Sequence, residues 1–186
     1  HIRSSHPFFF GWFVTLLCYP PFWAAVSGKY FRYEDALNWL GWLGDYPSVQ
    51  MLWGIMILAC VAVYGWATIT FGLRFSNLTH RGILTNGPFR FTKHPAYVSK
   101  NLSWWLISIP FIPSIGMTDA FRNCCLLLMV NAIYFFRAKM EEKHLSRDPA
   151  YVAYALWIEE HGLLRHISKY IPALKYTAPA ASPSSR

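Results

Sequence analysis

Residues 47–73 read PSVQMLWGIMILACVAVYGWATITFGL and contain no Asp, Glu, Lys or Arg. A helix needs about 20 mostly apolar residues to cross the hydrocarbon core of a bilayer, so this stretch predicts a transmembrane helix. Three other stretches are also uncharged, at residues 7–27, 101–118 and 123–136. We therefore expect an all-α integral membrane protein with about four transmembrane helices.

Prolines and arginines limit three of these four stretches. The adjacent prolines at 20–21 are expected to kink the first stretch, and Pro110 and Pro113 interrupt the third, because proline removes a hydrogen bond from a helix interior. The fourth stretch is short between Arg122 and Arg137. It crosses a bilayer only if these two long side chains extend outward to the interface.

The composition agrees with a membrane protein and excludes two other classes. Apolar residues make up 54% of the chain and charged residues only 14%, against about 25% charged residues in soluble globular proteins. So few charges cannot cover a soluble sphere, and a chain this apolar is not intrinsically disordered. The four cysteines lie inside apolar stretches without zinc-ligand spacing, and they predict neither a metal site nor a disulfide framework.

Basic residues gather in two segments. The formal net charge is +8; residues 74–100 hold five Lys or Arg and no acid, and eight basic residues follow from Arg137 onward. Basic charge beside apolar spans marks loops that face the cytoplasm and an anionic leaflet, so we expect a lipid bilayer rather than nucleic acid as the partner. We place both segments and both termini on the cytoplasmic side of a bacterial inner membrane or the endoplasmic reticulum.

The two ends of the chain differ from its middle. Residues 150–171 alternate apolar and charged positions at helical spacing, which predicts one amphipathic helix at the cytoplasmic surface. The last residues, TAPAASPSSR at 177–186, have the composition of a disordered tail. The chain starts with His1 rather than Met, so the question of whether a further helix precedes it stays open.

Two polar segments have no purpose in a plain membrane anchor. The first, RGILTNGPFRFTKHPAY at 81–97, ends where the third span begins. Pro95 restricts His94 to an extended conformation and suits the first position of a helix. His94 and Tyr97 would then lie at a helix start, which favours anionic groups. The alternative is an ordinary loop in which His94 caps the helix and Tyr97 belongs to an interfacial aromatic belt.

The second segment, RAKMEEKHL at 137–145, continues the fourth span directly into charged residues. Arg137 and Glu141 are four residues apart and share a helix face at the membrane boundary, where charged residues are functional candidates. The alternative is an arginine that reaches the interface, with a salt bridge that ends the helix. Because a short turn at 113–121 joins the third and fourth spans, we expect the two polar segments to converge on one pocket.

These segments resemble the signatures of the isoprenylcysteine carboxyl methyltransferase family, a group of integral membrane enzymes. GPFRFTKHPAY at 87–97 is similar to the family's G-x-Y-x-x-x-R-H-P-x-Y, and the second segment together with DPAYVAY at 148–154 is similar to its C-terminal signature. The resemblance covers residues 74–156, which we expect to be the methyltransferase core. From the apolar stretches we expect the first two transmembrane helices in residues 1–73, and from the composition the amphipathic helix and tail in residues 157–186.

The resemblance implies S-adenosylmethionine as the cofactor, bound at the cytoplasmic surface without a Rossmann fold. It also implies a lipophilic or small-molecule methyl acceptor: a prenylcysteine-like carboxylate, a phospholipid amine or a thiol. By position, the cofactor is expected to contact Arg81, Gly82, Ile83, Leu84, Phe89, His94, Pro95, Ala96, Tyr97 and Glu141. Arg137 is expected to face the acceptor as the catalytic residue.

The chemistry of these side chains suits methyl transfer. A carboxylate such as Glu141 accepts hydrogen bonds from ribose hydroxyls or an amino group, and the aromatic faces of Phe89 and Tyr97 suit a sulfonium. Arg137 can hold an anionic acceptor group. Direct displacement needs alignment in a dry, preorganised site more than it needs a covalent intermediate.

Two other functions stay open from the sequence. Membrane reductases of the sterol-reductase type, which use NADPH, carry a similar R-H-P-x-Y element, but they usually have Asn where this chain has Ala96. The other is a non-catalytic membrane subunit that kept the fold. Lys93 and Phe89, which stand where the family usually has Arg and often Tyr, favour that reading.

Overall fold

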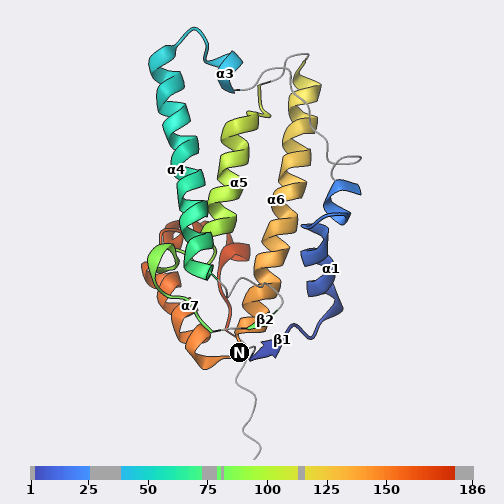
Figure 1. The fold of residues 1–186 in the computed structure, drawn as a ribbon, viewed down its shortest axis with the longest axis vertical. Helices are drawn as coiled ribbons and strands as arrows, with labels where there is room; N and C mark the ends of the chain where they lie inside the picture. Colours follow the sequence, from blue (N-terminus) through green and yellow to red (C-terminus); the bar gives the residue numbers. More distant parts are fainter. Residues whose placement is uncertain (1–2, 26–38, 73–78, 81, 113–115, 179–186) are drawn as a thin grey trace, which may run out of the picture.

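The computed structural model describes residues 3–25, 39–72, 79–80, 82–112 and 116–178, and these are mostly helical. Three helices run side by side along the longest axis of the molecule (Figure 1): α4 (Pro47–Phe71), α5 (Pro95–Ser108) and α6 (Met117–Leu145). Helix α1 (Phe9–Leu17) lies against α6. The prediction of a helical fold is therefore confirmed.

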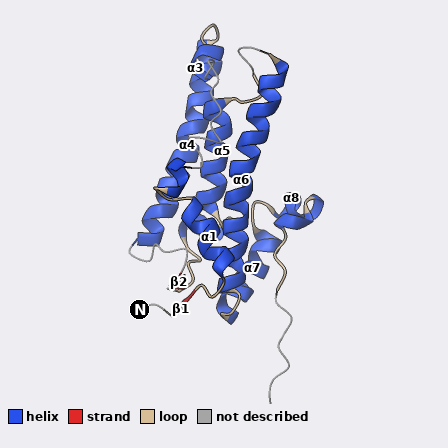
Figure 2. Ribbon diagram, turned by 90° about the vertical axis from the view of Figure 1, so that its right-hand side faces the viewer, coloured by secondary structure: helices blue, strands red, loops and turns tan. Residues whose placement is uncertain are grey.

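Short elements connect and cover these helices: β1 (Ser4–Ser5), α3 (Trp39–Trp42), β2 (Thr79–His80), η2 (Gly87–Arg90), α7 (Pro149–His161), α8 (Arg165–Tyr170) and η3 (Pro172–Leu174). The two strands pair antiparallel, with Ser4 opposite His80 and Ser5 opposite Thr79. Figure 2 shows α7 and α8 at one end of the helical body. The strand pair joins the N-terminal segment to the loop that leads into this end.

Helices α4 and α6 are each long and apolar enough to cross a bilayer, with 25 and 29 residues. At 1.5 Å per residue they are about 38 and 44 Å long, against a hydrocarbon core of about 30 Å. In the apolar 18-residue part of α4, only 6% of the residues are buried inside the molecule. Most of α4 therefore presents apolar side chains outward, as a lipid-facing helix does.

The fourth apolar stretch is the middle part of a longer helix. Helix α6 begins at Met117 and ends at Leu145, so the charged segment at 137–145 continues the same helix, as predicted. The helix also begins before Arg122, which the apolar stretch at 123–136 does not indicate, because arginine is itself a good helix former.

Helices α1 and α5 have only 9 and 14 residues, fewer than the roughly 20 that a span needs, so the prediction of four spans is not confirmed. Proline explains both lengths. Helix α1 ends before the prolines at 20–21. Helix α5 ends at Ser108, and the next residue, Ile109, has a left-handed φ of 43° and precedes Pro110. The expected stretches 7–27 and 101–118 also include residues outside the described part of the chain.

The prediction of one amphipathic helix at 150–171 is wrong, because α7 and α8 are separate helices. They are separated at Gly162, whose backbone is extended with φ −73° and ψ 165°. A Cβ at this position would lie 2.6 Å from the carbonyl oxygen of Ile158, so only glycine fits the turn. The Leu163 N–H then donates a hydrogen bond of 2.9 Å to the Phe91 carbonyl.

The C-terminal helices pack on the rest of the molecule through their own apolar cluster. Tyr151, Ala155 and Tyr176 are buried together, and side chains of α6 and of the loop after β2 pack against them. Helix α7 continues through residue 156, the expected end of the core region. Of the expected tail at 177–186, the last eight residues lie outside the described part of the chain.

Asp148 sets the start of α7 and holds the N-terminal segment. Its Oδ1 accepts a hydrogen bond from the Ala150 N–H at 2.9 Å. Its Oδ2 lies 3.3 Å from Arg3 Nη1 and 3.4 Å from His80 Nε2. We predict that Asp148→Ala lowers the free energy of unfolding by about 1–2 kcal/mol, which lowers the melting temperature in detergent by about 2–8 °C.

Two control variants separate the stability that the helix cap contributes from the effect of losing a negative charge. Asp148→Asn keeps an oxygen that can accept the Ala150 bond, so it should lose less stability than Asp148→Ala. Asp45→Ala, at an exposed residue, should melt like the wild type. An Asp148→Ala protein as stable as the wild type would contradict this role.

Candidate functional site

The loop before α5 lies close to the end of α4. Gly87 has a positive φ of 58°, and a Cβ there would lie 3.1 Å from Thr70 Oγ1 of α4. Glycine therefore serves both the backbone conformation and the close approach. Pro95 occupies the first turn of α5, as predicted, and His94 precedes it in a non-helical conformation. This geometry places His94 at the start of α5.

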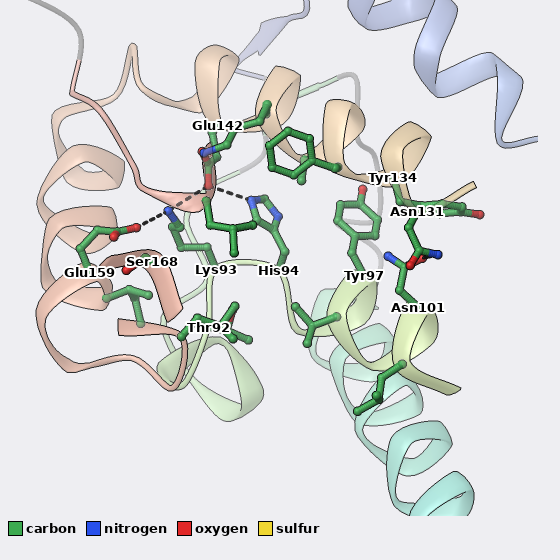
Figure 3. Close-up of a pocket in the computed structure, with 18 of the residues that line it drawn as sticks. Thr92, Lys93, His94, Tyr97, Asn101, Asn131, Tyr134, Glu142, Glu159 and Ser168 are labelled. Carbon is green, nitrogen blue, oxygen red and sulfur yellow. Dashed lines mark hydrogen bonds and ion pairs between the residues drawn. The ribbon is translucent and has the colours of Figure 1, made fainter. Parts of the chain in front are cut away.

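A buried carboxylate joins this helix start to the end of α6 (Figure 3). Glu142 Oε1 lies 3.0 Å from Lys93 Nζ and 3.2 Å from His94 Nε2. Glu142 Oε2 accepts a hydrogen bond from Lys139 Nζ at 2.9 Å. The side chains of Glu142 and Lys93 are only 7% and 8% exposed. Because buried charges are costly unless they are paired, these ion pairs hold the two segments in one relative position.

The same ion cluster extends to the C-terminal segment. Lys93 Nζ also lies 2.8 Å from Glu159 Oε1, and that oxygen accepts a bond of 3.0 Å from the Tyr176 N–H. Lys139 Nζ donates a hydrogen bond of 3.0 Å to the Lys175 carbonyl. These contacts hold α7 and the residues after η3 against the start of α5 and the end of α6.

Glu141 makes contacts with the other ring nitrogen of His94. Its Oε2 accepts a hydrogen bond from the Tyr97 hydroxyl at 3.2 Å and lies 4.0 Å from His94 Nδ1. The rings of His94 and Tyr97 are stacked, with centroids 5.6 Å apart. The predicted convergence of the two polar segments is therefore confirmed.

Arg137 lies in the same group of side chains and is only 5% exposed. Its Nη2 donates a hydrogen bond of 3.0 Å to the Tyr19 hydroxyl. Its Cζ lies 5.1 Å from the centroid of the Tyr19 ring and 5.4 Å from that of Tyr97. Aromatic faces stabilise a buried guanidinium. Tyr19 follows α1, and no motif in the sequence points to it as part of the site.

Lys100 is a second cation near Arg137 that sequence reasoning missed. Its Nζ donates a hydrogen bond of 3.1 Å to the Tyr134 hydroxyl. It also lies 5.0, 5.1 and 5.9 Å from the ring centroids of Tyr134, Trp104 and Tyr64. Among the described residues, no carboxylate is within ion-pair distance of Lys100. The rings and the hydroxyl supply its stabilisation instead.

Two adjoining cavities lie among these side chains. The helix cavity, of about 120 Å³, is lined by Phe89, His94, Pro95, Ala96, Tyr97, Glu141, Arg137 and Lys100 among others. The loop cavity, of about 50 Å³, is lined by Gly82, Ile83, Leu84, Phe89, His94 and Glu141 among others. Arg81 lies outside the described residues. The remaining predicted cofactor residues thus border at least one of the two cavities.

A larger cavity of about 420 Å³ lies between α5, α6 and the C-terminal helices (Figure 3). We call it the outer cavity. Of the predicted site residues, only His94 and Tyr97 line it. Two asparagines in its wall are bonded to each other, with Asn131 Nδ2 3.2 Å from Asn101 Oδ1. The outer cavity therefore borders the same ion cluster through Lys93, His94 and Glu142, but Arg137 and Glu141 do not line it.

Two tyrosines of the segment at 148–154, Tyr151 and Tyr154, also line the loop cavity. Neither was among the expected site residues. The Tyr154 hydroxyl donates a hydrogen bond of 2.6 Å to the Phe89 carbonyl. The Tyr151 side chain is 4% exposed, and its hydroxyl has no hydrogen-bond partner in the described structure. Burial raises the pKa of both hydroxyls, so both stay protonated at neutral pH.

Three buried histidines lie outside this site, at the junction of the N-terminal segment with α6: His6, His80 and His144. The His6 and His144 rings have centroids 5.2 Å apart. Within the described ranges, no group of three or more His, Cys, Asp or Glu is placed to hold a metal ion. None of these three rings lines the helix cavity or the loop cavity.

A comparison with known proteins identifies the region that carries the site. The model of the isoprenylcysteine carboxyl methyltransferase (ICMT) family matches residues 48–147, more than half of the chain. The match runs from the start of α4 to just beyond the end of α6, and it includes Phe89, His94, Arg137 and Glu141. No curated protein and no solved structure matches the chain significantly.

The ion pairs of Glu142 yield a stability prediction. Glu142→Gln leaves Lys93 and Lys139 with one fewer negative charge in a mostly buried cluster. We expect the free energy of unfolding to fall by about 3–5 kcal/mol, as for the loss of one partner of a buried pair. Thermal unfolding in detergent measures the change.

The control is Glu160→Gln, which removes the same charge from an exposed position on α7 and should leave the melting temperature unchanged. Adding Lys139→Met to Glu142→Gln should recover part of the lost stability, because Glu142 is the carboxylate that pairs with Lys139, whereas Lys93 keeps Glu159. Equal losses for Glu142→Gln and Glu160→Gln would show that the cluster does not hold the site together.

Proposed function

The chain belongs to the isoprenylcysteine carboxyl methyltransferase family, and we propose that it transfers a methyl group from S-adenosylmethionine to a lipophilic or small acceptor. The proposal rests mainly on the lining of the helix cavity and the loop cavity. These two cavities gather the described residues that the family signature assigns to the cofactor, and the helix cavity also includes Arg137.

The side chains around the two cavities have the chemistry that this cofactor requires. When bound, S-adenosylmethionine supplies a methyl group on a positively charged sulfur. The Glu141 carboxylate can accept hydrogen bonds from hydroxyl or amino groups. The ring of Phe89, which lines the helix cavity, attracts a cation through its face, whereas the Tyr97 ring already contacts His94 and Arg137. This set of groups fits the cofactor.

The site needs to open for a ligand of this size. The two cavities measure about 120 and 50 Å³, whereas small-molecule sites measure about 300–1,000 Å³. Phe71 and Phe89 border both cavities and contact each other edge to face, with centroids 5.2 Å apart. We expect these side chains to move apart and join the cavities when the cofactor binds.

Arg137 is the group that we assign to the acceptor. Its guanidinium is held by Tyr19 and Tyr97 and lies in the same cavity as Glu141, so it can orient an acceptor beside the cofactor. Arg137, Lys100 and Lys93 line the helix cavity, and of these Lys93 is paired with Glu142 and Glu159. An acceptor with an anionic group therefore suits this cavity better than a phospholipid amine.

The acceptor's apolar part has a direct route to lipid in this proposal. The helix cavity continues between α4 and α5, where Tyr64, Thr68 and Lys100 line it, and α4 presents most of its apolar surface outward. The basic residues at 74–100 and after residue 136 suggest that the reactive end lies at the cytoplasmic face.

Binding of S-adenosylhomocysteine tests the cofactor assignment. The purified protein in detergent is titrated by calorimetry with S-adenosylhomocysteine and, separately, with NADPH. We expect saturable binding of S-adenosylhomocysteine alone. Binding of NADPH alone would favour a membrane reductase, and binding of neither would favour a non-catalytic subunit; either outcome contradicts the proposal.

Two variants separate the cofactor role from the acceptor role. Glu141→Gln should weaken S-adenosylhomocysteine binding at least 10-fold, because hydrogen bonds to a charged group are worth about 1.5–3 kcal/mol. Arg137→Gln should keep that binding but lose at least 100-fold in methyl transfer from radiolabelled donor to a whole-membrane extract, as removal of an electrostatic stabiliser does. Equal loss of cofactor binding in both variants would show that the two roles are wrongly assigned.

A further inference from the structure

We propose that Tyr151 is a further cofactor-binding residue, whose hydroxyl forms a hydrogen bond with the nucleoside part of the cofactor in the loop cavity. This inference rests on the proposed function. It concerns a residue beyond the region 48–147 that the family match covers. It also gives α7, a helix that follows the membrane-spanning part of the chain, a direct part in the site.

The first observation is an unsatisfied buried hydroxyl. The Tyr151 side chain is 4% exposed, and its hydroxyl has no hydrogen-bond partner in the described structure. Leaving a buried polar group without a partner costs about 1–3 kcal/mol, and most buried polar side chains in native proteins are paired. A ligand that supplies the missing partner would remove this cost.

The second observation is the place of this side chain. Tyr151 lines the loop cavity together with Glu141 and with the segment at residues 82–84. The neighbouring Tyr154 also lines this cavity, but its hydroxyl is already bonded to the Phe89 carbonyl at 2.6 Å. Of the two tyrosines, Tyr151 is therefore the one whose buried hydroxyl has no hydrogen-bond partner in the described structure.

The residues that line the loop cavity indicate which part of the cofactor would lie there. Ile83, Leu84, Leu145, Phe71 and Phe89 give it apolar and aromatic walls, which suit a flat, uncharged purine. Lys93, His94 and Glu141 also line the cavity, and these polar groups suit the amino-acid part or the ribose hydroxyls. The charges of Glu142 and Glu141 act on the Tyr151 hydroxyl, so this hydroxyl lies near the polar groups. A nucleoside, with its purine against the apolar walls and its ribose toward the polar groups, suits this combination.

Packing explains how α7 holds Tyr151 in position. The Asp148 cap and Pro149 begin the helix, so Tyr151 lies in its first turn. The side chain is buried against Ala155 and Tyr176 in the apolar cluster of the C-terminal segment. Burial and the nearby charges of Glu142 and Glu141 raise the pKa of Tyr151 well above its ordinary value, so the hydroxyl stays protonated and can donate.

The test compares Tyr151→Phe with Tyr154→Phe in the full-length protein. We expect Tyr151→Phe to weaken S-adenosylhomocysteine binding about 5- to 20-fold by calorimetry. Its melting temperature without ligand should be equal to or above that of the wild type, because the change removes an unpaired buried group. Tyr154→Phe should instead melt at a lower temperature, because it leaves the Phe89 carbonyl without its partner.

A second ligand tests the assignment to the nucleoside. 5′-Methylthioadenosine has the nucleoside and sulfur without the amino-acid part, so Tyr151→Phe should weaken its binding by the same factor. Unchanged affinity of Tyr151→Phe for both ligands, or a loss for S-adenosylhomocysteine alone, would overturn the inference. A wild type that binds neither ligand would instead overturn the proposed function, so the two failures are distinguishable.

Discussion

Glu142 joins side chains from two segments of the chain at one buried carboxylate. Lys93 and His94 come from the loop before α5, and Lys139 lies one turn earlier on α6. Lys93 then continues to Glu159 of α7. Because each charge in this cluster is stable only while its partners are in place, the helix start, the helix end and the C-terminal segment are positioned together. The two cavities of the site depend on that arrangement.

The sequence predicted that the two polar segments come together. Uncharged stretches indicate helices, and an apolar hairpin returns its two ends to one side, so His94, Tyr97 and Glu141 could be placed together from their positions alone. The helix limits were predicted in part. Pro110 follows the end of α5, and α6 continues through Arg137 into the charged segment, as expected. Counting apolar residues did not show that α6 begins at Met117, before Arg122, because it does not register that arginine is a good helix former.

The residues that the sequence could not predict are those that reach the site from distant elements. Tyr19 contacts Arg137 across 118 positions of the chain, and tyrosine near a membrane interface is too common to single out. Glu142 is adjacent to Glu141, and the sequence does not show which of the two joins the ion cluster and which faces Tyr97. Lys100 lies on α5 among aromatic rings, and its neighbours become visible only when α4 and α6 are placed beside it.

The central claim is that one ligand occupies the space between the segment at 82–84, the start of α5 and Glu141. A structure of the protein with S-adenosylhomocysteine bound tests it most directly. We expect density that joins the helix cavity and the loop cavity, with the ligand within hydrogen-bond distance of Glu141. Density in the outer cavity instead, with Glu141 still bonded only to Tyr97, would contradict the account.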